Sequence, residues 1–491
     1  MNPKPSPRLP VMIGAATVSG AKTLSEAEHN PSDPIDLMAR AVEQAVKDSG
    51  VLGLLNHVDL TAVVGGLWSY RNPGELVARR LGVNPGRTLV TDFGGQVPVQ
   101  LCAAIAERIQ SGEIDVAVVI GGETNATRRA MSRSGTRAAR SEGHNASPDE
   151  FWGDPLVMGD EAAVDRGADL PRNAYAVLES ALRARRGETL DEARDRAAQI
   201  CFAYSLVAAT NPHAANGAMS ASEIREPSRT NRMVSWPYTK AMCANNTVDH
   251  AGAIIMCSHA AADRLGVATA KRVYPHAYVQ GKDTATLAER LDVSETPGLQ
   301  GTCGSLAAAI GGIDRVAHFE LYCCYPSMVT LTAEALGISL DRTLTVTGGL
   351  GFVGAPINFA AGEGLIGMIE RLRSDPGSIG VVQANGGFAS KHAFGAFSST
   401  APSGDCQILE YVPSGASRRV AAADACGRAV VDGITVEYDR SGPSRAIALV
   451  RYDDGARGWT NSDDLALMKS ATEVEWVGRT VRVVDGRFSA G

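Results

Sequence analysis

The stretch TDFGGQVPVQLCAAIAERIQSGEIDVAVVIGGE, residues 91–123, decides the fold. It predicts a tight turn, a helix, a short loop and a buried strand in succession. A turn that ends a strand and begins a helix directs backbone N–H groups and the positive end of the helix dipole toward whatever binds there. Many α/β enzymes place a nucleophile or a phosphate at such a turn. Here the tip is Gly94-Gly95-Gln96, without Cys, Ser or Asp.

Strands and helices alternate on both sides of this stretch, which predicts parallel βαβ units with right-handed crossovers. Predicted strands are 9–16, 60–64, 88–91, 116–120, 272–279, 316–321, 344–347 and 379–384. Predicted helices are 33–48, 73–81, 98–111, 304–310, 327–336 and 358–372. Residues 246–259 fit either a helix or a strand. Both halves contain a strand, a glycine-rich turn, a helix and a further strand, so we expect a duplicated α/β unit.

The alternation of predicted strands and helices is interrupted at two places, and these interruptions predict the domain boundaries. Residues 124–250 are rich in arginine and interrupt the alternation, as an insertion laid over the sheet would. After residue 402, strands 428–438, 445–452 and 479–484 alternate apolar and polar residues, which is typical of a small β-barrel. The predicted domains are 1–270 with the insertion 124–250, then 271–402, and a barrel at 403–491.

Length and composition limit the class of protein. A chain of 491 residues exceeds the size of a single hydrophobic core. A net charge of −7 argues against nucleic acid or an acidic membrane as the main partner. We find no apolar run of the roughly 20 residues that span a bilayer, and no signal-peptide core at the start. Nine scattered cysteines without a CxxC pair favour neither a metal nor a redox site. A cytoplasmic location is the expectation.

Six motifs carry a resemblance to a known family. They are GGETNATRRAMSR (121–133), NPHA (211–214), SWPYTKAMCANNTVDHAG (235–252), IDRVAHFELYCCYPS (313–327), GGLGFVGAP (348–356) and ANGGFASKHAFGAFSS (384–399). With these motifs the chain resembles the thiolase superfamily, and within it the thiolase-like proteins often labelled acetyl-CoA acetyltransferases. The resemblance implies an α/β thiolase fold, with two similar halves in five layers, an insertion domain and a C-terminal all-β barrel similar to an OB-fold. The C-terminal region has no zinc-ligand spacing.

The resemblance also implies a chemistry whose main groups are missing. Thiolases carry the acyl group on a cysteine thiolate at a helix N-terminus. Counting back along the helix places that position at Gly95, which cannot form an acyl-enzyme. The Gly-His-Pro loop, whose histidine binds the thioester oxygen, here reads Gly354-Ala355-Pro356. The loop that supplies a second cysteine in many thiolases here reads Ala384-Asn385-Gly386-Gly387.

Two side chains remain as candidates for moving protons. In the sterol-carrier type of thiolase the acid/base cysteine lies in a His-Asp-Cys-Phe motif, which matches Tyr322-Cys323-Cys324-Tyr325. Cys324 therefore takes the place of the acid/base cysteine, although two cysteines at a strand end also suit packing. His392 follows a glycine turn and is the second catalytic candidate, with a structural hydrogen bond as the alternative. The predicted substrate-binding residues are Gly95, Gln96, Tyr322, Ala355, Asn385 and Gly386.

Arg129, Arg133 and Arg137 recur every four residues and would lie on one face of a helix. Arg129 and Arg133 are the candidates for contacting CoA phosphates, since guanidinium groups bind phosphate well. A solvated stripe or a subunit contact would produce the same spacing.

Two functions stay open. One is a thiolase-like protein of lipid metabolism that binds CoA or acyl-CoA as ligand or substrate, without a permanent cofactor, and that is an acyltransferase if active. The other is a non-catalytic acyl-CoA-binding subunit or scaffold whose barrel docks a protein partner. Thiolase relatives are usually dimers or tetramers, so a homodimer is possible and a monomer is compatible with the sequence.

Overall fold

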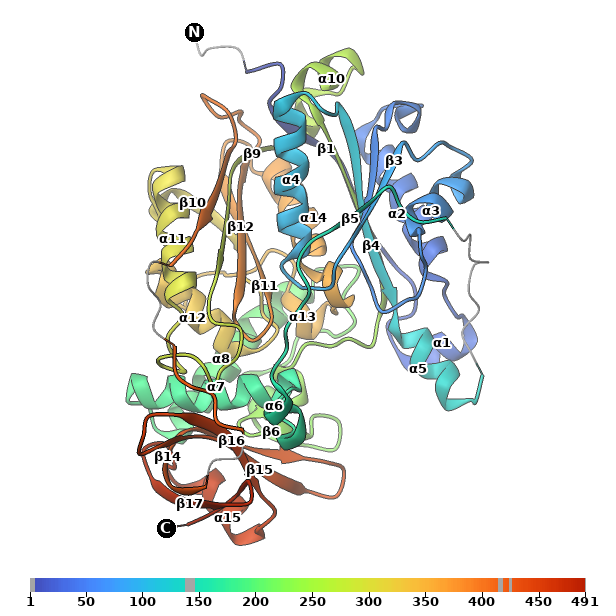
Figure 1. Cartoon of the computed structure of the whole chain (residues 1–491). Helices are drawn as coiled ribbons and strands as arrows, with labels where there is room; N and C mark the ends of the chain where they lie inside the picture. Colours follow the sequence, from blue (N-terminus) through green and yellow to red (C-terminus); the bar gives the residue numbers. More distant parts are fainter. Residues whose placement is uncertain (1–4, 137–145, 414–417, 424–425, 491) are drawn as a thin grey trace.

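The structure is a computed structural model that describes residues 5–136, 146–413, 418–423 and 426–490. Two sheets and three layers of helices form the main body in the order α/β/α/β/α (Figure 1). Helices α2 and α3 cover the outer face of the first sheet, α4 and α14 lie between the sheets, and α11 and α12 cover the second sheet. The predicted five layers are confirmed.

The first sheet has the strand order β1-β8-β4-β2-β3-β5. Its strands are β1 (Pro10–Ser19), β8 (Asp249–Ser258), β4 (Val116–Thr124), β2 (Leu60–Val63), β3 (Arg87–Thr91) and β5 (Glu150–Trp152). β4, β2, β3 and β5 are parallel, while β8 runs antiparallel between β1 and β4. The stretch that fitted either a helix or a strand is thus a strand. β5 belongs to the predicted insertion, and it covers the edge of β3.

The second sheet has the order β10-β11-β12-β9-β13. Its strands are β10 (Val316–Glu320), β11 (Ile379–Gly386), β12 (Lys391–Ser398), β9 (Tyr274–Lys282) and β13 (Gln407–Tyr411). The third sheet, in the order β15-β16-β18-β17-β14-β6-β7, is made of β15 (Pro443–Tyr452), β16 (Arg457–Ser462), β18 (Arg487–Ala490), β17 (Thr480–Val484), β14 (Gly427–Tyr438), β6 (Met233–Ser235) and β7 (Tyr238–Thr239). Because β6 and β7 come from the insertion, insertion and barrel share hydrogen bonds.

Fifteen α-helices connect these strands in the part of the chain that the structure describes. They are α1 (Leu24–His29), α2 (Pro34–Ser49), α3 (Pro73–Leu81), α4 (Val97–Ser111), α5 (Asn125–Arg133), α6 (Glu161–Arg166), α7 (Pro171–Arg186), α8 (Leu190–Ala208), α9 (Ala221–Arg225), α10 (His259–Arg264), α11 (Pro297–Ile310), α12 (Pro326–Leu336), α13 (Gly349–Phe352), α14 (Ala360–Ser374) and α15 (Leu465–Glu473). The C-terminal barrel therefore includes one helix, α15, and is not purely β.

The predicted strand 344–347 is wrong, because these residues lie in a loop. The loop is held by the buried carboxylate of Glu320, which accepts hydrogen bonds from the backbone N–H groups of Val346 (2.7 Å) and Thr347 (2.9 Å). The Thr347 hydroxyl donates to the same carboxyl group at 2.8 Å. A side chain thus supplies the acceptors that a neighbouring strand would otherwise provide.

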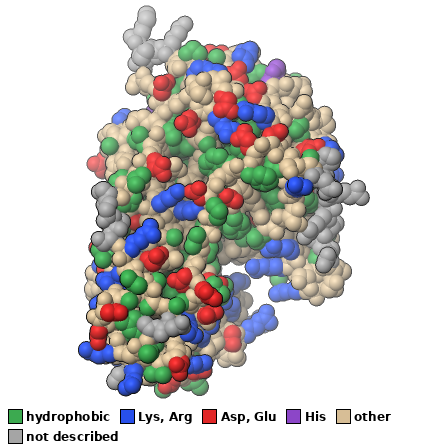
Figure 2. All heavy atoms as spheres, in the orientation of Figure 1, with side chains coloured by type: hydrophobic (Ala, Val, Ile, Leu, Met, Phe, Trp, Pro, Cys, Tyr) green, Lys and Arg blue, Asp and Glu red, His purple; other side chains and the backbone are tan. Residues whose placement is uncertain are grey.

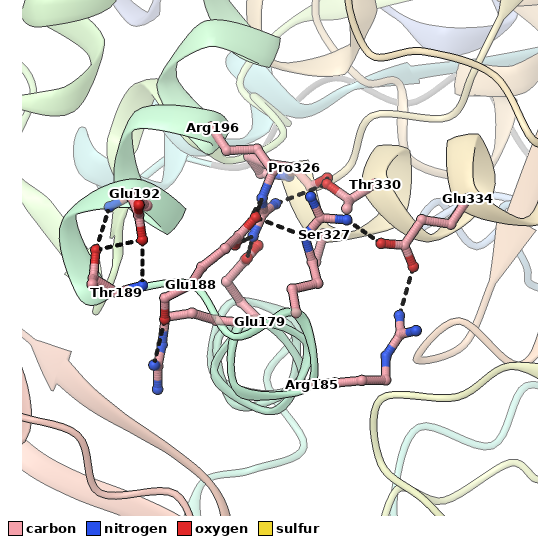
Figure 3. A network of polar contacts seen from close by, with 12 residues as sticks. Glu179, Arg185, Glu188, Thr189, Glu192, Arg196, Pro326, Ser327, Thr330 and Glu334 are labelled. Atoms are coloured by element: carbon pink, nitrogen blue, oxygen red, sulfur yellow. Dashed lines mark hydrogen bonds and ion pairs between the residues drawn. The ribbon is translucent and has the colours of Figure 1, made fainter.

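A buried polar network fixes the insertion helices α7 and α8 against α12 (Figure 3). Arg196 of α8 donates to Glu179 of α7 at 2.6 Å, to Glu188 at 2.9 Å and to Thr330 of α12 at 2.8 Å. The Tyr238 hydroxyl lies 2.7 Å from the carboxylate of Glu179 and 2.8 Å from the hydroxyl of Ser327 at the start of α12. The network therefore connects the insertion to the turn that precedes α12.

Removing Arg196 should destabilise the protein strongly. Its replacement by leucine would leave the Glu179 carboxylate, 1% exposed, without its charge partner, and breaking a buried pair in this way costs about 3–5 kcal/mol. Urea unfolding followed by circular dichroism measures the change. The matched control is Arg185→Leu, which removes a half-exposed pair with Glu334 and should cost less than about 1 kcal/mol. Equal losses for the two variants would show that the network is not a structural anchor.

Candidate functional site

The glycine turn before α4 lies at the contact between the two halves of the main body. The backbone N–H of Gly94 donates to the side-chain oxygen of Asn358 at 3.1 Å. The amide nitrogen of Asn358 in turn donates to the Gly65 carbonyl at 2.5 Å. Asn358 is buried and precedes α14. One side chain from the second half therefore holds two loops at the carboxyl ends of the first sheet's parallel strands.

Gly95 has no room for a side chain. A Cβ atom placed on Gly95 would lie 2.5 Å from the carbonyl oxygen of Asn385 and 2.6 Å from the hydroxyl oxygen of Tyr322. Both distances are shorter than any stable contact between carbon and oxygen. The position predicted for the nucleophile is thus occupied from outside by the Tyr322 hydroxyl. The structure brings Gly95, Tyr322 and Asn385 together, three residues that the sequence predicted for one site.

Gln96 and Gly386 form the adjoining part of this site. The side chain of Gln96 is buried and lies against Gly94 and Gly386, where a Cβ on either glycine would collide with the Gln96 amide. The Gln96 side-chain oxygen has no hydrogen-bond partner among the described residues. Gln96 is therefore closely packed but carries an unused acceptor.

Cys324 lies beside a tyrosine that the sequence did not single out. The thiol of Cys324 is within hydrogen-bonding reach of the Tyr175 hydroxyl of α7. That hydroxyl accepts from the Asn385 side-chain amide at 2.7 Å and from the Ala389 N–H at 3.0 Å, and it lies 3.0 Å from the Gly387 carbonyl. Burial raises the pKa of Cys324 to about 12, although Tyr175 opposes the shift. Cys324 is accordingly a thiol at neutral pH, suited to donating a proton rather than to nucleophilic attack.

Aromatic rings enclose this thiol. Tyr175 stacks on Tyr325 with ring centroids 4.8 Å apart, and Tyr325 stacks on Tyr238 at 5.5 Å. Tyr238 belongs to the polar network that holds α12. The candidate catalytic residue is thereby linked to the insertion, which sequence spacing did not reveal because α7 lies about 150 residues before Cys324 in the chain.

Ala355 joins the site through the backbone. Its N–H donates to the Asn245 carbonyl at 2.9 Å, while the neighbouring Ala244 N–H donates to the Cys324 carbonyl at 3.0 Å. The segment 244–245 thus bridges the loop of Ala355 and the loop of Cys324. Ala355 contributes no side-chain donor of its own.

His392 has a different partner. It is fully buried, and its Nε2 lies 2.9 Å from the carboxylate of Asp283. Asp283 also accepts from the N–H groups of Gly298 (2.7 Å) and Leu299 (3.1 Å) at the start of α11. The structure thus pairs His392 with a capped helix end and not with Cys324. Directly across the β11–β12 ladder it faces Asn385.

The arginines of α5 lie at the surface. Arg129 donates to the Thr247 hydroxyl at 2.7 Å, and partial burial together with Arg128 and Arg133 lowers its pKa. Arg133 is exposed, and Arg137 lies outside the described residues. Figure 2 shows Lys and Arg side chains along the hollow between the C-terminal barrel and the part of the molecule that carries α5.

Nothing in the described part of the chain resembles a metal site, since three or more His, Cys, Asp or Glu side chains do not come together there to hold an ion. Over the same residues, every helix is too short or too polar to cross a bilayer.

Comparison with known proteins agrees with this architecture. Residues 410–487 match the family model described as the thiolase-like protein type 1 additional C-terminal domain. A crystal structure of a monomeric SCP2-thiolase-like protein type 1 from Mycobacterium smegmatis is 26% identical with a TM-score of 0.83, covering 99% of this chain and 100% of that one. No curated protein sequence matches the chain.

Two further structures share the fold of the main body. An acetyl-CoA acetyltransferase from Syntrophomonas wolfei is 14% identical with a TM-score of 0.58, covering 80% of this chain and 99% of its own. The Ltp2-ChsH2(DUF35) aldolase is 15% identical with a TM-score of 0.60, covering 80% of this chain and 98% of that chain. The main body of the chain therefore has the thiolase fold. Its C-terminal residues match the additional domain of the thiolase-like proteins of type 1, and its whole length matches the structure of one such protein.

One titratable group near the site was missed by sequence reasoning. Glu123 ends β4, and its buried carboxyl accepts from the Leu67 N–H at 2.5 Å. Burial raises its pKa from 4.5 to about 7, with the Leu67 hydrogen bond and Arg128 opposing the rise. The available signal in the sequence was GGE at residues 121–123, a glutamate that directly continues an apolar strand.

Gly95→Ala should test the crowding at the turn. The added methyl group would overlap the Asn385 carbonyl and the Tyr322 hydroxyl, and overpacking of this kind costs about 1–3 kcal/mol. The matched control is Gly304→Ala in α11, where a Cβ meets open space and should stabilise the helix by up to about 1 kcal/mol. Thermal unfolding of both variants measures the difference. A Gly95→Ala variant as stable as the wild type would show that the site has room for a side chain.

Glu123 should make stability depend on pH. Because the folded-state pKa lies above the unfolded one, the stabilising effect of the proton is complete below pH 4.5 and is lost as pH rises toward 7. The loss is on the order of 3 kcal/mol. The Glu123→Gln variant keeps the acceptor oxygen and should lack this decline. Chemical denaturation at acidic and neutral pH compares the two proteins, and parallel pH profiles would contradict the assignment.

Proposed function

We propose that this protein binds CoA or a short acyl-CoA with the thioester directed at the turn before α4, and that it forms no acyl-enzyme. The observation that carries the proposal is the Tyr322 hydroxyl, which occupies the space of a nucleophile side chain at Gly95. The thiolase fold supplies the site, and one relative is by its name an acetyl-CoA acetyltransferase. Loss of the nucleophile restricts the reactions that such a site can support.

The chemistry open to this site is proton transfer. Cys324 is the proposed proton donor, because it remains a thiol at neutral pH. The Tyr175 hydroxyl and the Asn385 amide, 2.7 Å apart, hold the groups around it in place. Exchange of an α-proton, thioester hydrolysis and retro-aldol cleavage all proceed by acid/base catalysis without a covalent intermediate. In the exchange reaction we propose that solvent water takes up the proton that leaves the α-carbon, while the Cys324 thiol supplies the proton that replaces it and is reprotonated from solvent. The name of one structural relative includes the word aldolase.

For the CoA phosphates we propose the arginine face of α5. Arg129 and Arg133 lie on this helix at the surface, and the basic side chains bordering the hollow in Figure 2 would attract a phosphorylated ligand. Arg129 and Arg133 are the same residues that the four-residue spacing in the sequence indicated as candidates for contacting CoA phosphates.

A second candidate function is a binding subunit whose barrel docks a protein partner. The barrel exposes apolar side chains, with Leu465 68% exposed and Val484 50% exposed.

For the chain itself we propose a monomer, because β5 covers the edge of β3 within the same chain. One relative is likewise described as monomeric. A homodimer through another face, and the cytoplasmic location, remain predictions.

The experiment combines calorimetry with acetyl-CoA and NMR detection of α-proton exchange in D₂O. We expect binding in both wild type and Cys324→Ser, and exchange slowed at least tenfold in the variant, in the range that general acid–base groups contribute. Cys303→Ser, which changes a buried thiol in α11, is the matched control and should exchange like the wild type.

Three results would count against the proposal. Undetectable binding at millimolar acetyl-CoA would reject the substrate class. Unchanged exchange in Cys324→Ser would reject the proton-donor role. Binding without any exchange in the wild type would favour the binding-subunit function.

A further inference from the structure

Helix α4 lies in front in the view of Figure 1. Two adjoining cavities lie beside it, both lined by residues of α4, β9 and β12, and one of them also by residues of β13. Their volumes are about 220 Å³ and 160 Å³. Gln100, Trp152 and Gln280 line both, and the Gln100 amide donates to the Gln280 side-chain oxygen at 2.8 Å across the junction. We call the pair the α4 groove. Among the described residues that line it, neither Cys324 nor Tyr322 occurs.

The outer end of the α4 groove concentrates positive charge. Lys282 and Lys391 are direct cross-strand partners in the β9–β12 ladder, a position in which like charges repel. Asp154 pairs with Lys282 at 2.7 Å. The Lys391 ammonium donates to the backbone carbonyls of Asp154 and Pro155, each at 3.2 Å. Only the Lys282 ammonium pairs directly with the Asp154 carboxylate, while Asp154 and Asp92 act on Lys391 from a distance. A bound anion would relieve the repulsion between the two lysines.

The inner end is apolar. Its lining includes Val99, Ala103, Val279, Phe394, Ile408 and Leu409, and Glu107 is the one charged residue among the residues that line it. Alternate residues of a strand share a face, so Tyr278, Gln280 and Lys282 of β9 line the groove in order from the apolar end to the charged end. The groove therefore presents an apolar slot that ends in two cations.

Two buried polar side chains border the groove. Gln96 is among the residues that line the outer cavity, and Tyr278 is among those that line the inner one. Both residues are 2% exposed, and the Gln96 side-chain oxygen and the Tyr278 hydroxyl have no hydrogen-bond partner among the described residues. Buried polar groups are rarely left without a partner in native proteins.

We propose that the α4 groove binds a free medium-chain fatty acid. Its carboxylate lies between Lys282 and Lys391, and its alkyl chain extends past Gln280 toward Ile408. Lysine ammonium groups form charge-assisted hydrogen bonds to carboxylates, and burial of each methylene strengthens binding roughly two- to fourfold. The site stands independently of the proposed function. A ligand there would contact Gln96, whose side chain packs on Gly386.

The test is calorimetric titration of the full-length protein with decanoate, butyrate and 1-decanol. We expect saturable binding of decanoate, weaker binding of butyrate, and a preference of at least about tenfold for decanoate over decanol. Lys282→Gln with Lys391→Gln should abolish that preference. Ala104→Phe, which fills the inner cavity, should weaken decanoate binding. The matched control is Lys469→Gln on the barrel, where the lysine is 75% exposed.

Trp152 supplies a local optical signal, because it lines both cavities. Decanoate should shift the tryptophan fluorescence of the wild type, and Trp152→Phe should lose the shift while it keeps the heat of binding. Absent binding at millimolar decanoate, or equal affinity of the wild type for decanoate and decanol, would overturn the proposal without relying on any variant. An effect of Lys469→Gln equal to that of the double lysine variant would also overturn it.

Discussion

The contact of Tyr322 and the Asn385 carbonyl with Gly95 is the constraint on which the site depends. It ties the N-terminus of α4, in the first half of the main body, to the loop after β10 and to the end of β11 in the second half. An α4 helix with its positive end at this point still offers a favourable place for an anion or a carbonyl oxygen. The same contact removes the space in which a nucleophile would work. The turn therefore keeps the electrostatics of a thiolase-fold site while the covalent step is blocked.

The insertion also contributes to the candidate site, through a chain of contacts that leads from α7 and α8 to Cys324. The Arg196–Glu179 pair fixes α7 against α8, and Tyr238 extends the connection to Ser327 at the start of α12. Cys324 lies just before that helix, and Tyr175 on α7 meets its thiol. Because the pair is buried, we expect it to help define one arrangement of the insertion, as buried ionic groups do in some proteins. The position of Cys324 beside the Tyr175 hydroxyl is a consequence of this arrangement.

Much of the main body could be predicted from the sequence. Helical spacing in 98–111 and the apolar runs of the central strands indicated the layers, because periodicity reports which faces are buried. The strand 344–347 was wrong because Glu320, a residue outside the local pattern, supplies its hydrogen bonds. The β-strands of the barrel followed their alternation, whereas the pairing of β6 with β14 joins residues about 200 apart, beyond what local spacing can show.

Only part of the candidate site could be predicted, because local sequence patterns do not report contacts between distant elements. Motif matches assigned Gly95, Tyr322 and Asn385 to one predicted site, and these three residues lie side by side in the structure. Tyr175 and the lysine pair of the α4 groove depend on contacts between distant elements. The most direct measurement for the central claim is the intact mass of the protein after incubation with acetyl-CoA and acetoacetyl-CoA. The account predicts an unchanged mass, because Gly95 provides no nucleophile and Cys324 stays protonated. A stable increase by one acyl group on a residue of this site would contradict it.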